Sequence, residues 1–324
     1  MKLYALTFRI VAFLAIVAII SAAFWTQEPS FLSSNNMHAL LRHMSVNGLA
    51  ALGLTFVIVV RHYDLSFPGV ASLGAMTLGW LISVGAPLWV AISGCLAMGL
   101  VFGITNGIII ARFALPGIVT TIATGGLAIG FSYFYSGGTS ISQNLFMSGL
   151  LDLNDGRVLG LDKPFVILLS VALVGMVILH GSRFGRAFYA TGENPTSAFF
   201  SGIPVKPMIV AAYTICGLCA CLSIVLLVAS SGAANVTAGN QLLMPAFAAV
   251  YLGAALFGRP SVLATMAGTM LMSLMLNGFT LLAIPYYYSD AIVSTVLILS
   301  ITLFDVRIFG ALSRVFTIRK EALT

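Results

Sequence analysis

The sequence predicts an all-α protein, a polytopic integral membrane helical bundle of about ten transmembrane helices. Of its 324 residues, 60% are hydrophobic and 7% are charged, and the mean hydropathy is +1.07. A water-soluble protein of this length needs far more charge to cover its surface. Lipid cannot pair with backbone polar groups, so chains cross it as helices or closed barrels, and apolar runs without strict alternation favour helices.

Ten apolar stretches have the length of a membrane-spanning helix. The third and the eighth are short and rich in glycine, so a count of nine or eleven stays open. The first begins like a signal peptide, but its length and the spans that follow it favour a retained helix. No linker or low-complexity tract divides the chain, which predicts one membrane domain over residues 1–324. The stretches are residues 8–25, 44–60, 68–84, 87–111, 116–136, 164–180, 207–230, 242–257, 261–284 and 288–304.

The basic residues predict the orientation of these spans. With the N-terminus inside the cell, only Arg42, Arg157 and Lys163 of the fifteen basic residues fall on the outer side. Because basic residues gather on the cytoplasmic side of membrane proteins, we expect both termini and the polar segment 181–207 in the cytoplasm, with the loop 137–163 outside. The net charge of +6 follows from this asymmetry and does not indicate nucleic-acid binding. The expected inner set is Lys2, Arg9, Arg61, Arg112, Arg183, Arg186, Lys206, Arg259, Arg307, Arg314, Arg319 and Lys320.

The motifs of the common catalytic and metal sites do not occur in the sequence. No lysine stands in the Gly-Lys-Ser/Thr loop that holds ATP phosphates. The histidines do not pair at metal-ligand spacing, and Cys216-x-x-Cys219 has no second pair to complete a site. We therefore expect no enzyme, no metal site and no cofactor on this chain, and any ATP that drives it would bind to partner subunits.

The acidic residues indicate what kind of solute the bundle suits. All of them map to loops or to the ends of spans, whereas ion-coupled carriers commonly place ionisable groups at membrane depth. An uncharged membrane core suits a neutral polar solute. The nine acidic residues are Glu28, Asp64, Asp152, Asp155, Asp162, Glu193, Asp290, Asp305 and Glu321.

Uncharged polar residues within the spans are candidates to line a solute path, because amides and hydroxyls both donate and accept hydrogen bonds. The alternative for each of them is a hydrogen bond between helices, and the sequence leaves both uses open. The path-lining candidates are Asn47, Thr55, Asn106, Thr120, Thr121 and Asn277, with Thr124 and Thr280 of the same kind.

The polar segment 181–207 is predicted to contain a short helix of its own. Asn194-Pro195 has the N-cap and first-turn preferences of a helix start, and Gly202 has those of a helix end. An ordered helix outside the membrane has two explanations, which are the docking of a partner and a plain connection between spans.

Four stretches, in order along the chain, carry a recognisable pattern. The first is 35–60, with Ser45-Val46-Asn47-Gly48 at its centre, and the second is Asp64-Leu65-Ser66. The third runs from Gly185-Arg186 through Gly192-Glu193-Asn194 to Ser201-Gly202-Ile203, and the fourth is 245–258. Their order and spacing resemble the permease subunits of bacterial ABC importers of the ribose, xylose and galactose type.

The resemblance implies both a mechanism and partners. Two permease subunits, in a homodimer or a heterodimer, would form a path for a sugar or related neutral solute across the bacterial inner membrane. Two cytoplasmic ATP-binding subunits would drive transport, and a periplasmic binding protein would deliver the solute. A secondary carrier or channel for a neutral solute stays open, as does an ABC permease for a furanone signal or an amino acid. The resemblance assigns ATPase coupling to Arg186, Gly192, Glu193, Asn194, Ala198, Phe199, Phe200, Ser201, Gly202 and Ile203.

Overall fold

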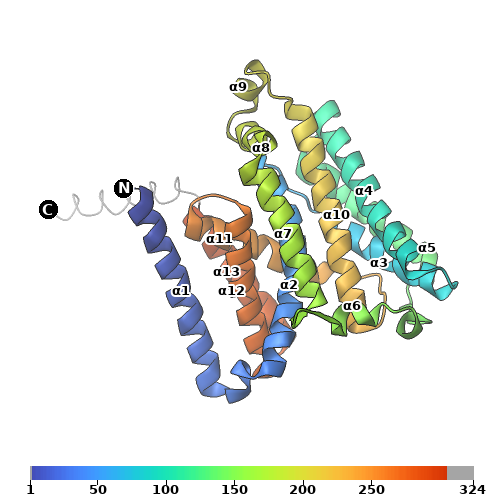
Figure 1. Cartoon of the computed structure of the whole chain (residues 1–324). Helices are drawn as coiled ribbons and strands as arrows, with labels where there is room; N and C mark the ends of the chain where they lie inside the picture. The colour runs from blue at the N-terminus through green and yellow to red at the C-terminus, as the bar shows by residue number, and fades with distance from the viewer. Residues whose placement is uncertain (1, 305–324) are drawn as a thin grey trace, which may run out of the picture.

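The ten predicted spans are all helices in the computed structural model, which describes residues 2–304 (Figure 1). Eight of these helices are long and apolar enough to cross a membrane, and α3 and α13 are shorter apolar helices. The prediction that the C-terminus is cytoplasmic falls on residues outside the described ones, as do its basic residues Arg307, Arg314, Arg319 and Lys320. The ten are α1 (Lys2–Gln27), α2 (Ser34–Val59), α3 (Phe67–Ser83), α4 (Leu88–Phe113), α5 (Gly117–Ser136), α7 (Lys163–Gly181), α10 (Val205–Ser231), α11 (Asn240–Phe257), α12 (Val262–Leu281) and α13 (Tyr286–Phe304).

Helix α2 stands at the centre of the bundle and contains a long unbroken run of buried residues. Every residue of α2 from position 45 to 59 is buried. It packs against α7 and α10 on one side and against α11 and α12 on the other (Figure 1). The helix begins at Ser34, ten residues before the expected span, because Ser33 caps it by accepting a hydrogen bond from Asn36 N at 3.3 Å.

The short elements gather at the two ends of the bundle. Figure 1 draws α8 (Arg183–Glu193) and α9 (Pro195–Phe200) at the end where α1 begins, and α6 (Leu151–Asp155) at the opposite end. We call these the α9 end and the α6 end. The α6 end also carries the remaining small elements, which are η1 (Pro29–Leu32), η2 (Leu145–Met147) and the antiparallel pair β1 (Arg157–Val158) and β2 (Leu161–Asp162).

The segment 137–163 is folded against the bundle and is not an open loop. Asp162 is 0% exposed, and its Oδ2 lies 2.7 Å from Nδ1 of His38 on α2. Arg42, one turn further along α2, donates to Asp155 at 3.1 Å. These contacts fix the α6 end of the chain to the central helix.

In the turn between α2 and α3 the acidic residue is buried, which sequence reasoning did not anticipate for a charged loop, although Arg61 and Tyr63 are exposed. Asp64 is 2% exposed, and its Oδ1 accepts hydrogen bonds from Ser66 N at 2.8 Å and Ser66 Oγ at 2.6 Å. Burial raises the pKa of the Asp64 carboxyl, and the hydrogen bonds from Ser66 oppose that shift. The carboxyl group is therefore a structural part of this turn.

The connection from α10 to α11 turns back into the bundle. Residues 232–239 form no helix, and Ala234 pairs with Ile141 in an isolated bridge at the α6 end. The segment then follows α3, because an added Cβ at Gly79 would lie 2.6 Å from Ala234 Cβ, and Gly239 N donates to Ser72 Oγ at 3.0 Å. Ser72 is about 16 Å along α3 from the residue that ends it at the α6 end. Helix α11 therefore begins deep inside the bundle.

Candidate functional site

Helix α9 is a single capped turn that presents two phenylalanine rings to the surroundings. Asn194 Oδ1 accepts a hydrogen bond from Ser197 N at 2.9 Å, and Pro195 occupies the first turn. Phe199 is 67% exposed and Phe200 is 83% exposed, with ring centroids 5.7 Å apart. Sequence reasoning predicted this helix, which the structure contains, and the family resemblance assigned these two residues to ATPase coupling.

Helix α8 precedes α9 and rests on the end of α2. Sequence reasoning did not predict α8, which Ser182 caps by accepting from Phe184 N and Gly185 N. Phe188 is buried with its ring 5.5 Å from that of Phe56 on α2. An added Cβ at Gly192 would overlap the carbonyl oxygen of Val59, so only glycine allows this approach. The segment is thus in backbone contact with the central helix.

The other residues predicted for coupling surround this contact. Ala198 is buried, whereas Arg186 and Glu193 are exposed on α8. Gly202 has φ +80°, the left-handed conformation in which glycine ends a helix. The exposed and half-exposed remainder, which completes the connection to α10, is Asn194, Ser201 and Ile203.

A cavity of about 710 Å³ opens beside α8, at the α9 end. We call it the tyrosine cavity, because Tyr63, Tyr189 and Tyr251 line it. Arg259 lies over the Tyr189 ring at 5.0 Å, and the Tyr189 hydroxyl donates to the carbonyl oxygen of Pro260 at 2.9 Å. Burial raises the pKa of Tyr189, against the opposing charge of Arg259. This cavity separates α8 from the end of α11.

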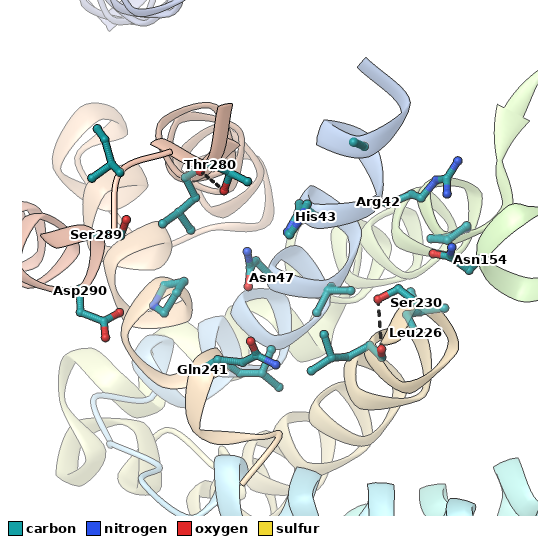
Figure 2. Close-up of a pocket in the computed structure, with 18 of the residues that line it drawn as sticks. Arg42, His43, Asn47, Asn154, Leu226, Ser230, Gln241, Thr280, Ser289 and Asp290 are labelled. Carbon is teal, nitrogen blue, oxygen red and sulfur yellow. Dashed lines mark hydrogen bonds between the residues drawn. The ribbon is translucent and has the colours of Figure 1, made fainter. Parts of the chain in front are cut away.

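A second cavity, of about 740 Å³, lies at the α6 end between α2, α10, α11, α12 and α13. We call it the amide cavity, because Asn47, Asn154 and Gln241 line it (Figure 2). Figure 2 shows Asn47 and Gln241 directed toward its centre from α2 and α11. Its other polar residues are Arg42, His43, Ser230, Thr280, Ser289 and Asp290.

Seven of the eight path-lining candidates fall into two groups in the structure, and the eighth, Thr120, is buried on α5. Asn47 and Thr280 line the amide cavity. Thr55 bonds Thr265 of α12 through hydroxyl oxygens 2.6 Å apart, and Asn106 Nδ2 donates to Ser66 Oγ at 2.7 Å. Three of the remaining candidates make internal bonds: Asn277 with Asn36 in both directions at 2.8 and 2.9 Å, Thr121 with Gly117 O at 2.9 Å, and Thr124 with Thr120 O at 3.0 Å.

Gln241 is one of the polar lining residues that sequence reasoning missed. It lies just outside the predicted span 242–257, so it was not among the path-lining candidates. A usable signal was present, because Asn240-Gln241 is an uncompensated polar pair next to a span that is too short. Among the described residues, no three His, Cys, Asp or Glu side chains come together as metal ligands.

Comparison with known proteins identifies relatives along most of the chain. Residues 36–301 match the family described as branched-chain amino acid transport system / permease component. The ribose import permease protein of Escherichia coli K12 is 30% identical over 298 residues, which cover 90% of this chain and 91% of that protein. The ribose import permease protein of Bacillus subtilis is 32% identical over 279 residues, covering 85% of this chain and 86% of that protein.

Two further relatives extend the comparison. The autoinducer 2 import system permease protein of Escherichia coli O9:H4 is 32% identical over 293 residues, covering 89% of each chain. A solved inward-facing metal-chelate type ABC transporter has the same fold, with TM-score 0.51 and 15% identity over 94% of this chain and 98% of that one. The match to the family decides against a stand-alone carrier or channel. The chain belongs to this family of transport system permease components, and it is a membrane-spanning transport subunit and not an enzyme.

Proposed function

We propose that this chain forms the path for a sugar or related neutral polar solute in an ATP-driven importer of the bacterial inner membrane. Two permease subunits, alike or different, would form the path. Two cytoplasmic ATP-binding subunits would hold the ATP, and a periplasmic binding protein would deliver the solute. The similarity to ribose import permeases over nine-tenths of the chain supports the solute class.

The observation that carries the proposal is the exposed pair of rings on α9. Phe199 and Phe200 lie on a capped turn at the α9 end, which the basic residues assign to the cytoplasm. Large apolar rings in water are unfavourable unless a partner covers them, and aromatic anchors with a polar rim are usual in docking surfaces. Arg186 and Glu193 on α8 would supply that rim. We therefore propose that the ATP-binding subunit docks on the segment 181–207.

Replacing both rings tests this docking. The double variant Phe199→Asp, Phe200→Asp is expected to lose association with the ATP-binding subunit, since anchors of this kind contribute about 2 kcal/mol or more each. The measurement is the amount of ATP-binding subunit that co-purifies with the permease in detergent. The matched control is Leu159→Asp, because Leu159 is 99% exposed at the α6 end.

The control also separates docking from folding. Leu159→Asp should leave co-purification unchanged, and all variants should elute as the wild type does in size-exclusion chromatography. Unchanged co-purification of the double aspartate variant would contradict the docking proposal.

A furanone-derived signal is the second candidate solute, and the autoinducer 2 import permease among the relatives favours it. An amino acid is the third, because the family description refers to branched-chain amino acids. A thermal-shift panel on the binding protein encoded beside this chain would separate the three classes. A shift with pentoses or hexoses supports the proposed solute, and a shift with leucine alone contradicts it.

A further inference from the structure

The connection 232–239 places unwound backbone at membrane depth. Gly239 N bonds Ser72 Oγ at 3.0 Å, and an added Cβ at Gly239 would overlap the carbonyl oxygen of Pro68. Non-helical backbone is tolerated at this depth only where protein buries it or where it borders a water-filled cavity. The buried apolar side chains of the segment, those of Ala234 and Val236, face the protein. The other face of the segment requires a polar environment.

Polar side chains cover that other face. Asn235, Thr237, Asn240 and Gln241 are all exposed in the chain. Asn235 Oδ1 accepts from Thr237 N and Thr237 Oγ1, both at 2.8 Å, which stabilises the local turn. Four exposed polar residues within seven positions are unfavourable in lipid. One of them, Gln241, lines the amide cavity, which indicates contact with water or solute.

The amide cavity reaches the same depth from the other side. Asn47 lies about 20 Å along α2 from its start at the α6 end. Figure 2 shows Asn47 on α2 across the cavity from Gln241 on α11, with His43 and Thr280 toward the rim. Each amide offers donors and acceptors at once, which matches a hydroxyl group. The volume of the amide cavity, about 740 Å³, lies within the usual range of small-molecule sites.

We propose that the amide cavity of each chain is a binding site for a neutral hydroxylated solute, with Asn47 and Gln241 as its recognition groups and the segment 232–239 as its floor. The inference rests on the proposed function and names where within a single permease chain the solute binds. The competing occupant is a lipid acyl chain, because Leu226, Leu242 and Leu276 also line the cavity. The central amide pair favours the hydroxylated solute.

Cysteine labelling distinguishes these occupants. The native cysteines, Cys95, Cys216, Cys219 and Cys221, are all buried, so Gln241→Cys and Asn47→Cys would be read against a low background. A membrane-impermeant cationic thiosulfonate is added to the outside of cells that express the complete transporter. Ser170→Cys is the control, because Ser170 is exposed on the flank of α7 and lines neither cavity.

We expect both cavity cysteines to react faster than Ser170→Cys by about tenfold or more, because the reagent reacts with an accessible thiolate and a lipid-facing thiol stays protonated. A mixture of ribose, xylose, galactose and glucose should slow that reaction. Labelling no faster than at Ser170→Cys would overturn the proposal and indicate a cavity filled by lipid. Fast labelling that none of these sugars slows would overturn it as well.

Uptake and docking assays separate this proposal from the importer assignment. Gln241→Leu is expected to reduce sugar uptake about tenfold through the loss of one hydrogen-bonding group, while Gln241→Asn retains part of it. Co-purification of the ATP-binding subunit should stay unchanged in both variants. If sugars protect Gln241→Cys but no ATP-binding subunit co-purifies with the wild type, the importer assignment fails and the site stands. Normal uptake by Gln241→Leu would contradict the proposed binding site and leave the importer assignment intact.

Discussion

Asn36 and Asn277 hold distant parts of the chain together through a reciprocal amide pair. Each Nδ2 donates to the other Oδ1, at 2.8 and 2.9 Å, and Asn36 Nδ2 also donates to the carbonyl oxygen of Phe31 at 2.7 Å. The pair joins α2 to α12 close to η1. Polar residues at helix interfaces in membranes act in this way, where apolar burial offers little drive for association.

The variant Asn277→Ala is expected to lower the free energy of unfolding by about 1–2 kcal/mol, because it leaves the Asn36 amide buried without its partner. Asn36→Ala should lose more, because Asn36 also bonds the carbonyl oxygen of Phe31. The double variant Asn36→Ala, Asn277→Ala should lose less than the sum of the two single changes, since no unpaired amide remains. Thermal unfolding in detergent measures all three, and strictly additive losses would contradict a direct bond.

For single residues, the sequence predicted which side chains could line a path but not what each of them contacts. Asn47 and Asn277 are both asparagines within spans, and both were candidates to line a path. Only the direction of each side chain separates them, because Asn47 points into the amide cavity and Asn277 points to Asn36. A helix that is apolar on all sides has no periodic signal to identify the face on which a polar residue lies.

The cap of α9 determines whether its exposed rings keep their place. A helix of six residues is too short to be stable by itself, so its single side-chain cap from Asn194 matters more than in a long helix. Asn194→Ala is expected to destabilise the turn by about 1 kcal/mol and to weaken co-purification of the ATP-binding subunit several-fold. Asn194→Asp keeps a capping oxygen and should bind as the wild type does. Equal weakening by both variants would argue against the cap.

The contact between Gly192 and Val59 couples α8 to α2 through backbone atoms. Gly192→Val is expected to push α8 away from α2, since even one Cβ overlaps the Val59 carbonyl oxygen. Docking at α9 should persist, while ATP-driven uptake falls by about tenfold or more because α8 and α2 no longer move together. Gly181→Val is the control, because an added Cβ at Gly181 meets no atom within 4 Å. Normal uptake by Gly192→Val would show that this contact does not transmit movement from α8 to α2.

Element by element, hydropathy predicted the spans well and their connections poorly. The cores of all ten helices were found because length and apolarity are properties of a whole stretch. Helix α8 was missed because its sequence is polar and its support, Phe56, is remote in the chain. The turn back at 232–239 was missed because residues such as Ala234 and Val236 do not differ from those of a helix. Tertiary contact with α3 determines that backbone.

For the whole molecule, the basic residues predict which end faces the cytoplasm. Phe200→Cys at the α9 end should react with an impermeant thiol reagent in inside-out vesicles and not in right-side-out vesicles. Leu159→Cys at the α6 end should react in right-side-out vesicles and not in inside-out vesicles. Both positions are strongly exposed in the permease chain, so when it is expressed without the ATP-binding subunit a failure to react indicates sidedness and not burial. The reversed pattern would invert the orientation that the charges predict.

Helix α2 contacts both the segment proposed for docking and the cavity proposed for the solute, which has a mechanical consequence. At one end its Val59 supports α8, and about 18 Å away its Asn47 borders the amide cavity. An α-helix is stiff along its axis because each turn is hydrogen-bonded to the next. A displacement imposed at Val59 therefore reaches Asn47 as rigid-body motion of one helix. No series of side-chain rearrangements is needed between the proposed docking segment and the proposed solute site.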